Sequence, residues 1–227
     1  MLFRSVGFMD LEKAYDSVDR NCLWQVLSIY GIIGKLLGGI KSLIEGSRAC
    51  VKVNGVTSDW FEIRNGLKQG CVMSPWLFNI YMDGVMKEVK QGMSNKGVQL
   101  VCGKIEWRIS DLLYADDVAF VAESGSELNE MVNKFNRVCI RRGLKINADK
   151  SKVLIVGGRE DEGHVVSLDG KVLENVKEFS YLGSTLNGKG TDGNDCDKRV
   201  KKGRKIDRKS TRLNSSHRSL SRMPSSA

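Results

Sequence analysis

The fold of this chain can be read from the segment Tyr114-Ala115-Asp116-Asp117 and its two flanks, the apolar runs 109–113 and 118–121. Two short apolar runs joined by a tight turn predict a β-hairpin, here with two adjacent acids at its tip. Two carboxylates about 4 Å apart repel by roughly 4 kcal/mol at an effective dielectric of about 20. The pair therefore indicates either a well-solvated turn or a bound cation, and Mg²⁺ is a cation that prefers carboxylate oxygens.

A third acid, Asp10, has the same placement, because it directly follows the apolar run 6–9. Three carboxylates from two strands can hold two metal ions about 3.5–4 Å apart, as in polymerases and nucleases. Phosphoryl transfer depends on positioning and charge neutralisation more than on covalent chemistry. The three acids therefore predict a site for nucleotidyl transfer.

Five segments, in this order, resemble the motifs of reverse transcriptases from non-LTR (LINE-type) retrotransposons. Each motif alone is weak or moderate evidence, whereas the ordered set is specific and extends over roughly residues 2–186. The segments are FMDLEKAYD at 8–16, GLKQGCVMSPWLFN at 66–79, YADD at 114–117, GLKIN at 143–147 with KSK at 150–152, and FSYLG at 179–183.

The resemblance implies catalytic roles for individual residues. It makes Asp10 and Asp116 ligands of two Mg²⁺ ions, with Mn²⁺ as the alternative metal, and Asp117 a supporting third ligand. It makes Tyr15 the steric gate that packs under the incoming sugar, with an ordinary half-buried aromatic as the alternative. It makes Lys150 the proton donor to the leaving pyrophosphate, with a solvated surface charge as the alternative.

The remaining implied contacts are with substrates. Gln69 and Gly70 match residues that approach the dNTP and the template, where a glycine lets backbone come close to a ligand. A plain turn glycine is the alternative for Gly70. Tyr181, Leu182 and Gly183 match the primer grip. The expected partners are an RNA template, a DNA primer and dNTPs.

The pattern between the motifs predicts an α+β polymerase palm, an antiparallel sheet with helices packed on one face. Helices are expected to begin after an N-cap at Asp19 or Ser17, at Pro75 and at the capping box 124–127, and to end near Gly31, residue 91 and Gly143. Strands or hairpins are expected at 49–63 around Asn54-Gly55, at 152–156 and at 165–173, with loops at 92–103 and 157–163.

The expected domain organisation has three parts. Residues 1–186 form the palm with partial fingers elements, 187–206 a linker and the start of a truncated thumb or connection helix, and 207–227 a disordered tail. The tail resembles a translated sequencing adapter. Most of the fingers, the thumb and the endonuclease region of the family are expected to be missing, so the fragment is expected to be inactive alone.

Two further alternatives remain open at this point. One is a non-catalytic retrotransposon relic with at most weak nucleic-acid or metal binding. The other is an RNA-templated RNA polymerase, which Tyr15 disfavours because such enzymes usually have a small polar group at that place.

The net charge of +9 is unevenly distributed. Residues 198–227 contain 11 basic residues and one acid, which gives +10, whereas residues 1–197 contain 25 basic and 26 acidic residues, which gives −1. The body of the chain therefore shows no bulk charge typical of nucleic-acid binding.

Other features indicate the class and compartment of the protein. No apolar run approaches the roughly 18 residues of a membrane span, and no signal peptide is recognisable. The six cysteines show no Cys-x-x-Cys spacing and are expected to be reduced thiols. The expected location is intracellular, in the cytoplasm, the nucleus or both, and the oligomeric state is left open.

Overall fold

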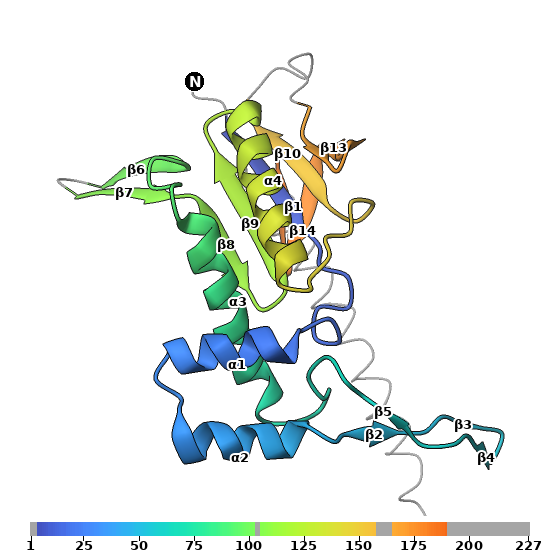
Figure 1. Cartoon of the computed structure of the whole chain (residues 1–227). Helices are drawn as coiled ribbons and strands as arrows, with labels where there is room; N and C mark the ends of the chain where they lie inside the picture. Colours follow the sequence, from blue (N-terminus) through green and yellow to red (C-terminus); the bar gives the residue numbers. More distant parts are fainter. Residues whose placement is uncertain (1–3, 103–104, 158–164, 190–227) are drawn as a thin grey trace, which may run out of the picture. The chain divides into compact units, whose positions relative to one another are not determined.

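The computed structural model describes residues 4–102, 105–157 and 165–189 (Figure 1). The chain divides into two compact units, the first ending at Val176 and the second beginning at Lys177.

The first unit is built on a five-stranded sheet in the order β13-β10-β1-β9-β8. The central strand β1 (Arg4–Met9) lies between β10 (Lys152–Val156) and β9 (Asp117–Ala122), and both pairings are antiparallel. Strand β8 (Asp111–Tyr114) continues the antiparallel arrangement beyond β9. Strand β13 (Glu174–Val176) pairs with β10 in parallel.

The predicted palm is confirmed with one difference, because the sheet is mixed and not wholly antiparallel. The chain leaves β10, passes through the 165–173 hairpin and re-enters the sheet at Glu174 in the same direction as β10. The direction of β13 is thus set by the intervening connection, which a three-residue strand does not reveal in sequence.

Helix α4 (Gly125–Arg141) covers one face of this sheet, and the other helices pack in turn beside or below it (Figure 1). Helix α4 packs on β1 and β9, and α3 (Ser74–Lys90) packs on α4. Helix α1 (Arg20–Ile29) packs on α3, and α2 (Gly34–Ile44) lies beside α1. The stripe of α4 that was expected in the core is buried: Leu128, Met131, Val132, Phe135, Val138 and Cys139.

Helix α2 was not predicted from the sequence. Its segment contains Gly34, Gly38 and Gly39, and no side chain caps its N-terminus. Glycine lowers helix stability by about 1 kcal/mol relative to alanine, so local propensity gives little sign of this helix. Burial of Ile40 and Ile44 contributes the stability that the intrinsic helix propensity of this segment does not provide.

The other helix boundaries follow local chemistry. Asp19 caps α1 by accepting a hydrogen bond from the backbone N–H of Cys22 at 2.9 Å, and Gly31 follows the helix with φ +82°. Ser124 caps α4 by accepting from the N–H of Glu127 at 3.1 Å. The capping box is only half formed, because the Glu127 carboxylate accepts from the N–H groups of Gly97 and Glu123, each at 2.9 Å, and not from that of Ser124.

The expected hairpin at 49–63 is present in two short ladders. Strand β2 (Arg48–Ala49) pairs with β5 (Phe61–Glu62), and β3 (Lys52–Val53) pairs with β4 (Val56–Thr57). The connecting Asn54-Gly55 turn has positive φ at both residues, 51° and 86°, as a two-residue type I′ turn requires.

Two more hairpins belong to the first unit. Strand β6 (Val98–Cys102) pairs with β7 (Ile105–Ile109), so the loop expected at 92–103 is wrong from residue 98 onward. Strand β11 (Ser167–Leu168) pairs with β12 (Lys171–Val172), which confirms the hairpin expected at 165–173.

The second unit contains one described hairpin, β14 (Glu178–Tyr181) with β15 (Ser184–Asn187). The 157–163 loop beyond Gly157, most of the predicted 187–206 linker and the whole 207–227 tail lie outside the described residues. Within the described ranges, no helix is both long and apolar enough to cross a membrane. Cys22, Cys50, Cys71 and Cys139 are free thiols.

Candidate active site

The acidic pair lies at the tip of the β8–β9 hairpin, as predicted. Tyr114 pairs with Asp117, which leaves Ala115 and Asp116 as a two-residue turn, and Ala115 has φ 54°. Side chains alternate along a strand, and Phe120 of β9 contacts Phe135 of α4. Asp117, three residues away, therefore projects from the sheet face opposite α4.

Asp10 joins this pair because β1 runs beside β9. Met9 is opposite Val118 in the register, so the next position along β1 brings Asp10 opposite Asp117. Burial raises the pKa of Asp117, and the charges of Asp116 and Asp10 raise it further. The three carboxylates predicted from the sequence are thus close enough to repel one another.

The backbone of Asp10 is held by the segment that follows α4. Its N–H donates to Ser151 Oγ at 3.1 Å, and its carbonyl accepts from the N–H of Asn147 at 2.8 Å. Ser151 Oγ in turn donates to the Asn147 carbonyl at 2.7 Å. Nothing in the sequence singled out Ser151 for this role, although an asparagine at the start of such a turn commonly bonds backbone a few residues on.

The same turn positions Lys150. Asn147 Oδ1 accepts from the backbone N–H of Lys150 at 3.3 Å. The Lys150 ammonium lies 4.0 Å from Asp10 Oδ2, and the two side chains are 69% and 40% exposed. An exposed pair of this kind contributes about 0–1 kcal/mol, so Lys150 is available for a bound anion.

Tyr15 lies beside the acidic turn. Its ring stacks on that of Phe78 in α3, with centroids 4.4 Å apart and an interplanar angle of 13°. Burial raises the pKa of Tyr15, and the charge of Asp116 raises it further. The ring is therefore fixed next to the carboxylates, where a steric gate would be needed, and its role as a gate stays a prediction.

The second motif is tied to the segment before α1. The N–H of Gly66 donates to the Val18 carbonyl at 2.9 Å, and that of Leu67 donates to the Tyr15 carbonyl at 2.8 Å. A Cβ on Gly66 would lie 2.7 Å from the Asp16 carbonyl oxygen, so only glycine fits there. This close approach brings the second motif against the first.

Arg20 is a structural residue that the sequence did not reveal. It is buried, and its guanidinium donates to the carbonyls of Gly66 at 3.0 Å and Ile63 at 2.9 Å. A cation in the first turn of a helix is normally expected to be solvated. Here it fixes the approach to the second motif.

Gln69 and Gly70 lie at the exposed end of this motif. Gln69 Nε2 donates to Asp16 Oδ1 at 3.4 Å, a weak contact that a ligand could replace. Gly70 has φ +80°, and nothing lies within 4 Å of a Cβ built on it. Its glycine is needed for the backbone conformation, and the space beside it is open.

Tyr181, Leu182 and Gly183, the predicted primer grip, form the end of the β14–β15 hairpin. Leu182 and Gly183 make a two-residue turn with φ 48° and 79°. These residues belong to the second unit.

The donor set fits a divalent ion in its chemistry but does not form a complete cage. Within the described ranges, no three His, Cys, Asp or Glu side chains gather as a metal-binding group. Mg²⁺ usually takes one or two carboxylates together with waters and substrate phosphates. The arrangement therefore leaves coordination positions that waters or a ligand could fill.

Comparison with known proteins gives a consistent result. The model of a family described as reverse transcriptase (RNA-dependent DNA polymerase) matches residues 4–186. The chain is 27% identical over 194 residues to a Pol polyprotein from the type-1 retrotransposable element R2 of Popillia japonica, covering 82% of this chain and 31% of the polyprotein. It is also 27% identical over 186 residues to the RNA-directed DNA polymerase from mobile element jockey of Drosophila funebris, covering 79% of this chain and 19% of that polymerase.

Solved structures resemble the fold. Telomerase from Candida albicans superposes with a TM-score of 0.60 at 13% identity, covering 81% of this chain and 29% of telomerase. Telomerase from Candida tropicalis gives a TM-score of 0.59 at 15% identity, covering 82% of this chain and 34% of that chain. At such identities the likeness shows the fold alone.

Proposed function

Because the chain belongs to the reverse transcriptase family, we propose that it carries the palm of an RNA-directed DNA polymerase from a LINE-type retrotransposon. The reaction is the addition of dNTPs to the 3′-hydroxyl of a DNA primer on an RNA template. The observation that supports it is the convergence of Asp10 and Asp117 from paired strands, with the Lys150 ammonium 4.0 Å from Asp10.

Each side chain has a task in this reaction. Asp10 and Asp116 would hold two Mg²⁺ or Mn²⁺ ions, with Asp117 in support. The bound ions supply charge neutralisation at the reacting phosphate and lower the pKa of the attacking hydroxyl. Tyr15 excludes a 2′-hydroxyl, and Lys150 Nζ gives a proton to the pyrophosphate as it leaves.

The substrate contacts are those that the motif resemblance implies. Gln69 and Gly70 approach the dNTP and the template base, and residues 181–183 hold the primer end. One of the telomerases of similar fold was solved with a fragment of telomeric RNA. RNA and dNTPs occur in the cytoplasm and the nucleus, and we expect the protein there.

The chain spans between 18% and 31% of the length of its first curated relatives. We therefore expect the isolated chain to bind metal and nucleotide more readily than it extends a primer. The binding step is tested with Mn²⁺ and dATP by equilibrium dialysis, which measures the Mn²⁺ retained with the protein beyond that held by free dATP.

The wild-type chain is expected to take up Mn²⁺ in a dATP-dependent manner, and the Asp116→Ala/Asp117→Ala variant is expected to lose this uptake. Equal uptake by both would count against the site. Primer extension on an RNA template with Mg²⁺ and dNTPs, run with the same two proteins, shows whether the palm is an autonomous polymerase. Extension that disappears in the variant would overturn the expectation of low activity.

The gate is tested in the same assay with ATP in place of dATP. Tyr15→Ala is expected to bind Mn²⁺·ATP about as well as Mn²⁺·dATP, because the ring under the sugar is gone. Tyr15→Phe keeps the ring stacked on Phe78 and is the matched control, which should still prefer dATP. No change of preference in Tyr15→Ala would rule out the gate.

A further inference from the structure

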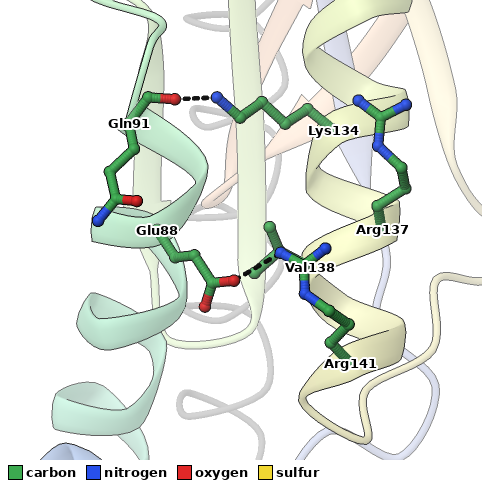
Figure 2. Close-up of a pocket in the computed structure, with 6 residues that line it drawn as sticks. All are labelled: Glu88, Gln91, Lys134, Arg137, Val138 and Arg141. Atoms are coloured by element: carbon green, nitrogen blue, oxygen red, sulfur yellow. Dashed lines mark hydrogen bonds and ion pairs between the residues drawn. The ribbon is translucent and has the colours of Figure 1, made fainter.

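A basic groove lies between α3 and α4, and its lining contains no residue of the five family motifs (Figure 2). Its cations come from α4 at positions 134, 137 and 141, a spacing that places them on one side of a helix. Figure 2 shows α3 residues facing them across the groove. The groove has a volume of about 220 Å³ and is lined by Glu88, Gln91, Lys134, Arg137, Val138 and Arg141.

The one acid in this lining, Glu88, already forms ion pairs with two arginines. Glu88 Oε1 lies 2.5 Å from Arg141, and its Oε2 lies 2.8 Å from Arg142. The hydrogen bond from Arg141 lowers the pKa of the Glu88 carboxyl, and Arg142 lowers it further. One carboxylate thus serves two guanidinium groups and cannot neutralise the other cations.

The remaining two cations are less engaged. The Lys134 ammonium donates to the Gln91 carbonyl, a neutral oxygen at the end of α3. Arg137 is exposed and forms no hydrogen bond or ion pair with any described residue. The hydrogen bond from Lys96 lowers the pKa of Glu130 on the same helix as Arg137, and the charges of Lys134 and Arg137 lower it further at long range. Three cations and one acid give the lining +2, whereas residues 1–197 as a whole carry −1.

The size of the groove favours a small anionic group. A water molecule takes about 30 Å³ in the liquid, so 220 Å³ is enough for a phosphate group of a strand together with a few waters. Drug-sized ligands usually occupy roughly 300–1,000 Å³. Val138 alone is apolar in the lining, which disfavours an apolar partner helix.

The spacing of the cations favours a chain of anions. Seven residues of helix at about 1.5 Å each extend over roughly 10 Å, so the cations from Lys134 to Arg141 form a row. A single phosphate cannot contact the whole row, whereas successive phosphates of one strand can.

The groove also lies apart from the acids. It belongs to the helical layer, whereas Asp10 and Asp117 project from the sheet face opposite α4. A ligand in the groove would not occupy the nucleotide site.

We propose that the α3–α4 groove binds the phosphate backbone of a nucleic-acid strand, as a contact separate from the catalytic face. The proposal does not depend on polymerase activity, because binding to the groove requires neither metal nor dNTP.

The test is fluorescence anisotropy of the full chain with a fluorescein-labelled polyuridine oligonucleotide, between about 50 and 200 mM salt. Arg137→Gln is compared with Lys35→Gln, a control that removes one exposed cation from α2. All proteins keep residues 198–227 and their +10 charge, so the contribution of that segment cancels. Circular dichroism confirms equal folding.

Arg137→Gln is expected to weaken binding several-fold and to reduce the slope of log affinity against log salt by about 0.7, the value for one phosphate contact on a single strand. Lys35→Gln should leave the slope unchanged. The same loss is expected when Arg137→Gln is placed in the Asp116→Ala/Asp117→Ala chain, which separates failure of this proposal from failure of the catalytic one.

Three outcomes would overturn the proposal. An unchanged slope in Arg137→Gln is the first, and an equal loss in Lys35→Gln is the second. In the third, inorganic phosphate at constant ionic strength raises the melting temperature of the wild type but not of Arg137→Gln, while oligonucleotide binding is equal in both. That result would assign the groove to a free anion.

Discussion

Among single residues, Asp117 carries the clearest electrostatic cost of the site. Burial and the charges of Asp116 and Asp10 all disfavour its ionised form. In the unfolded chain Asp117 has a pKa of about 3.9. As the pH rises above this value, the unfolded state loses the Asp117 proton first, and the native state loses it only at a higher pH. Raising the pH through this window therefore lowers the free energy of unfolding.

Asp117→Asn should consequently be more stable than the wild type at pH 7 in the presence of EDTA. The difference should shrink as the pH falls through the raised pKa and vanish below the unfolded-state value. Urea unfolding at several pH values measures it. Asp59→Asn, at an exposed position between β4 and β5, is the control and should show no such trend. A wild type as stable as Asp117→Asn at pH 7 would contradict the repulsion.

Gly66 and Gly70 form a second residue-level comparison within one motif. Both have positive φ, 81° and 80°, but only at Gly66 would an added Cβ lie less than 3 Å from other backbone, namely that of Asp16. Gly70→Ala is expected to cost about 1–2 kcal/mol for the left-handed backbone. Gly66→Ala should cost a further 1–3 kcal/mol or so for the overlap. Thermal unfolding of the two variants checks the order, and equal costs would refute the close approach.

Among the elements, α4 confirms only half of the capping box that its sequence predicts. The sequence predicts a reciprocal capping box, and the structure keeps the Ser124 half while Glu127 bonds Gly97 and Glu123. Glu127 thereby connects the start of α4 to the chain before β6. A tertiary contact has replaced a local one.

Ser124→Ala should cost about 1 kcal/mol of stability, the usual effect of losing an N-cap. Ser126→Ala is the matched control, because Ser126 is exposed two residues further into the same helix. Its effect should stay within about 0.5 kcal/mol. Urea denaturation measures both, and similar values for the two serines would mean that the cap contributes nothing.

Considered as a whole, the first unit depends on the layer of α4 over β1 and β9. Phe135 is fully buried and meets Phe120 edge to face, with centroids 5.2 Å apart. Phe135→Ala should destabilise the protein by about 3–5 kcal/mol. Ile140→Ala on the same helix should change stability by about 0.5 kcal/mol or less, since Ile140 is 59% exposed. A small effect at Phe135 in denaturant titrations would show that the helical layer is not the core.

Features set by neighbouring residues could be predicted from the sequence. The acidic hairpin, the buried stripe of α4 and the turn at Asn54-Gly55 follow from alternation, helical spacing and turn chemistry. The meeting of Asp10 with Asp117 joins residues 107 positions apart, and the acids together with the resemblance to ordered family motifs indicate it where local pattern alone could not.

Features set by distant residues could not be predicted. The parallel pairing of β13 depends on the path of the preceding hairpin, and β6 was obscured by the glycines around it. The support of Asp10 by Ser151 joins residues 141 positions apart, and the burial of Arg20 depends on carbonyls more than 40 positions away. Hydrogen bonds between residues so far apart in sequence produce no periodic pattern that could be recognised in the sequence.

The sheet order leaves β8 at one end of the described strands, and this has an effect on how the protein behaves in solution. Leu112, Leu113 and Tyr114 on this outermost strand are 46%, 37% and 65% exposed. An open, apolar edge strand can pair with a strand of a second molecule. Strand β8 is followed immediately by the turn that contains Asp116. Stacked copies would hide the acids and mimic an inactive enzyme. Leu112→Lys should raise the protein concentration at which light scattering first detects aggregates. Ile29→Lys on α1 is the control and should leave that concentration unchanged. A poorly active preparation should therefore be checked for monodispersity first.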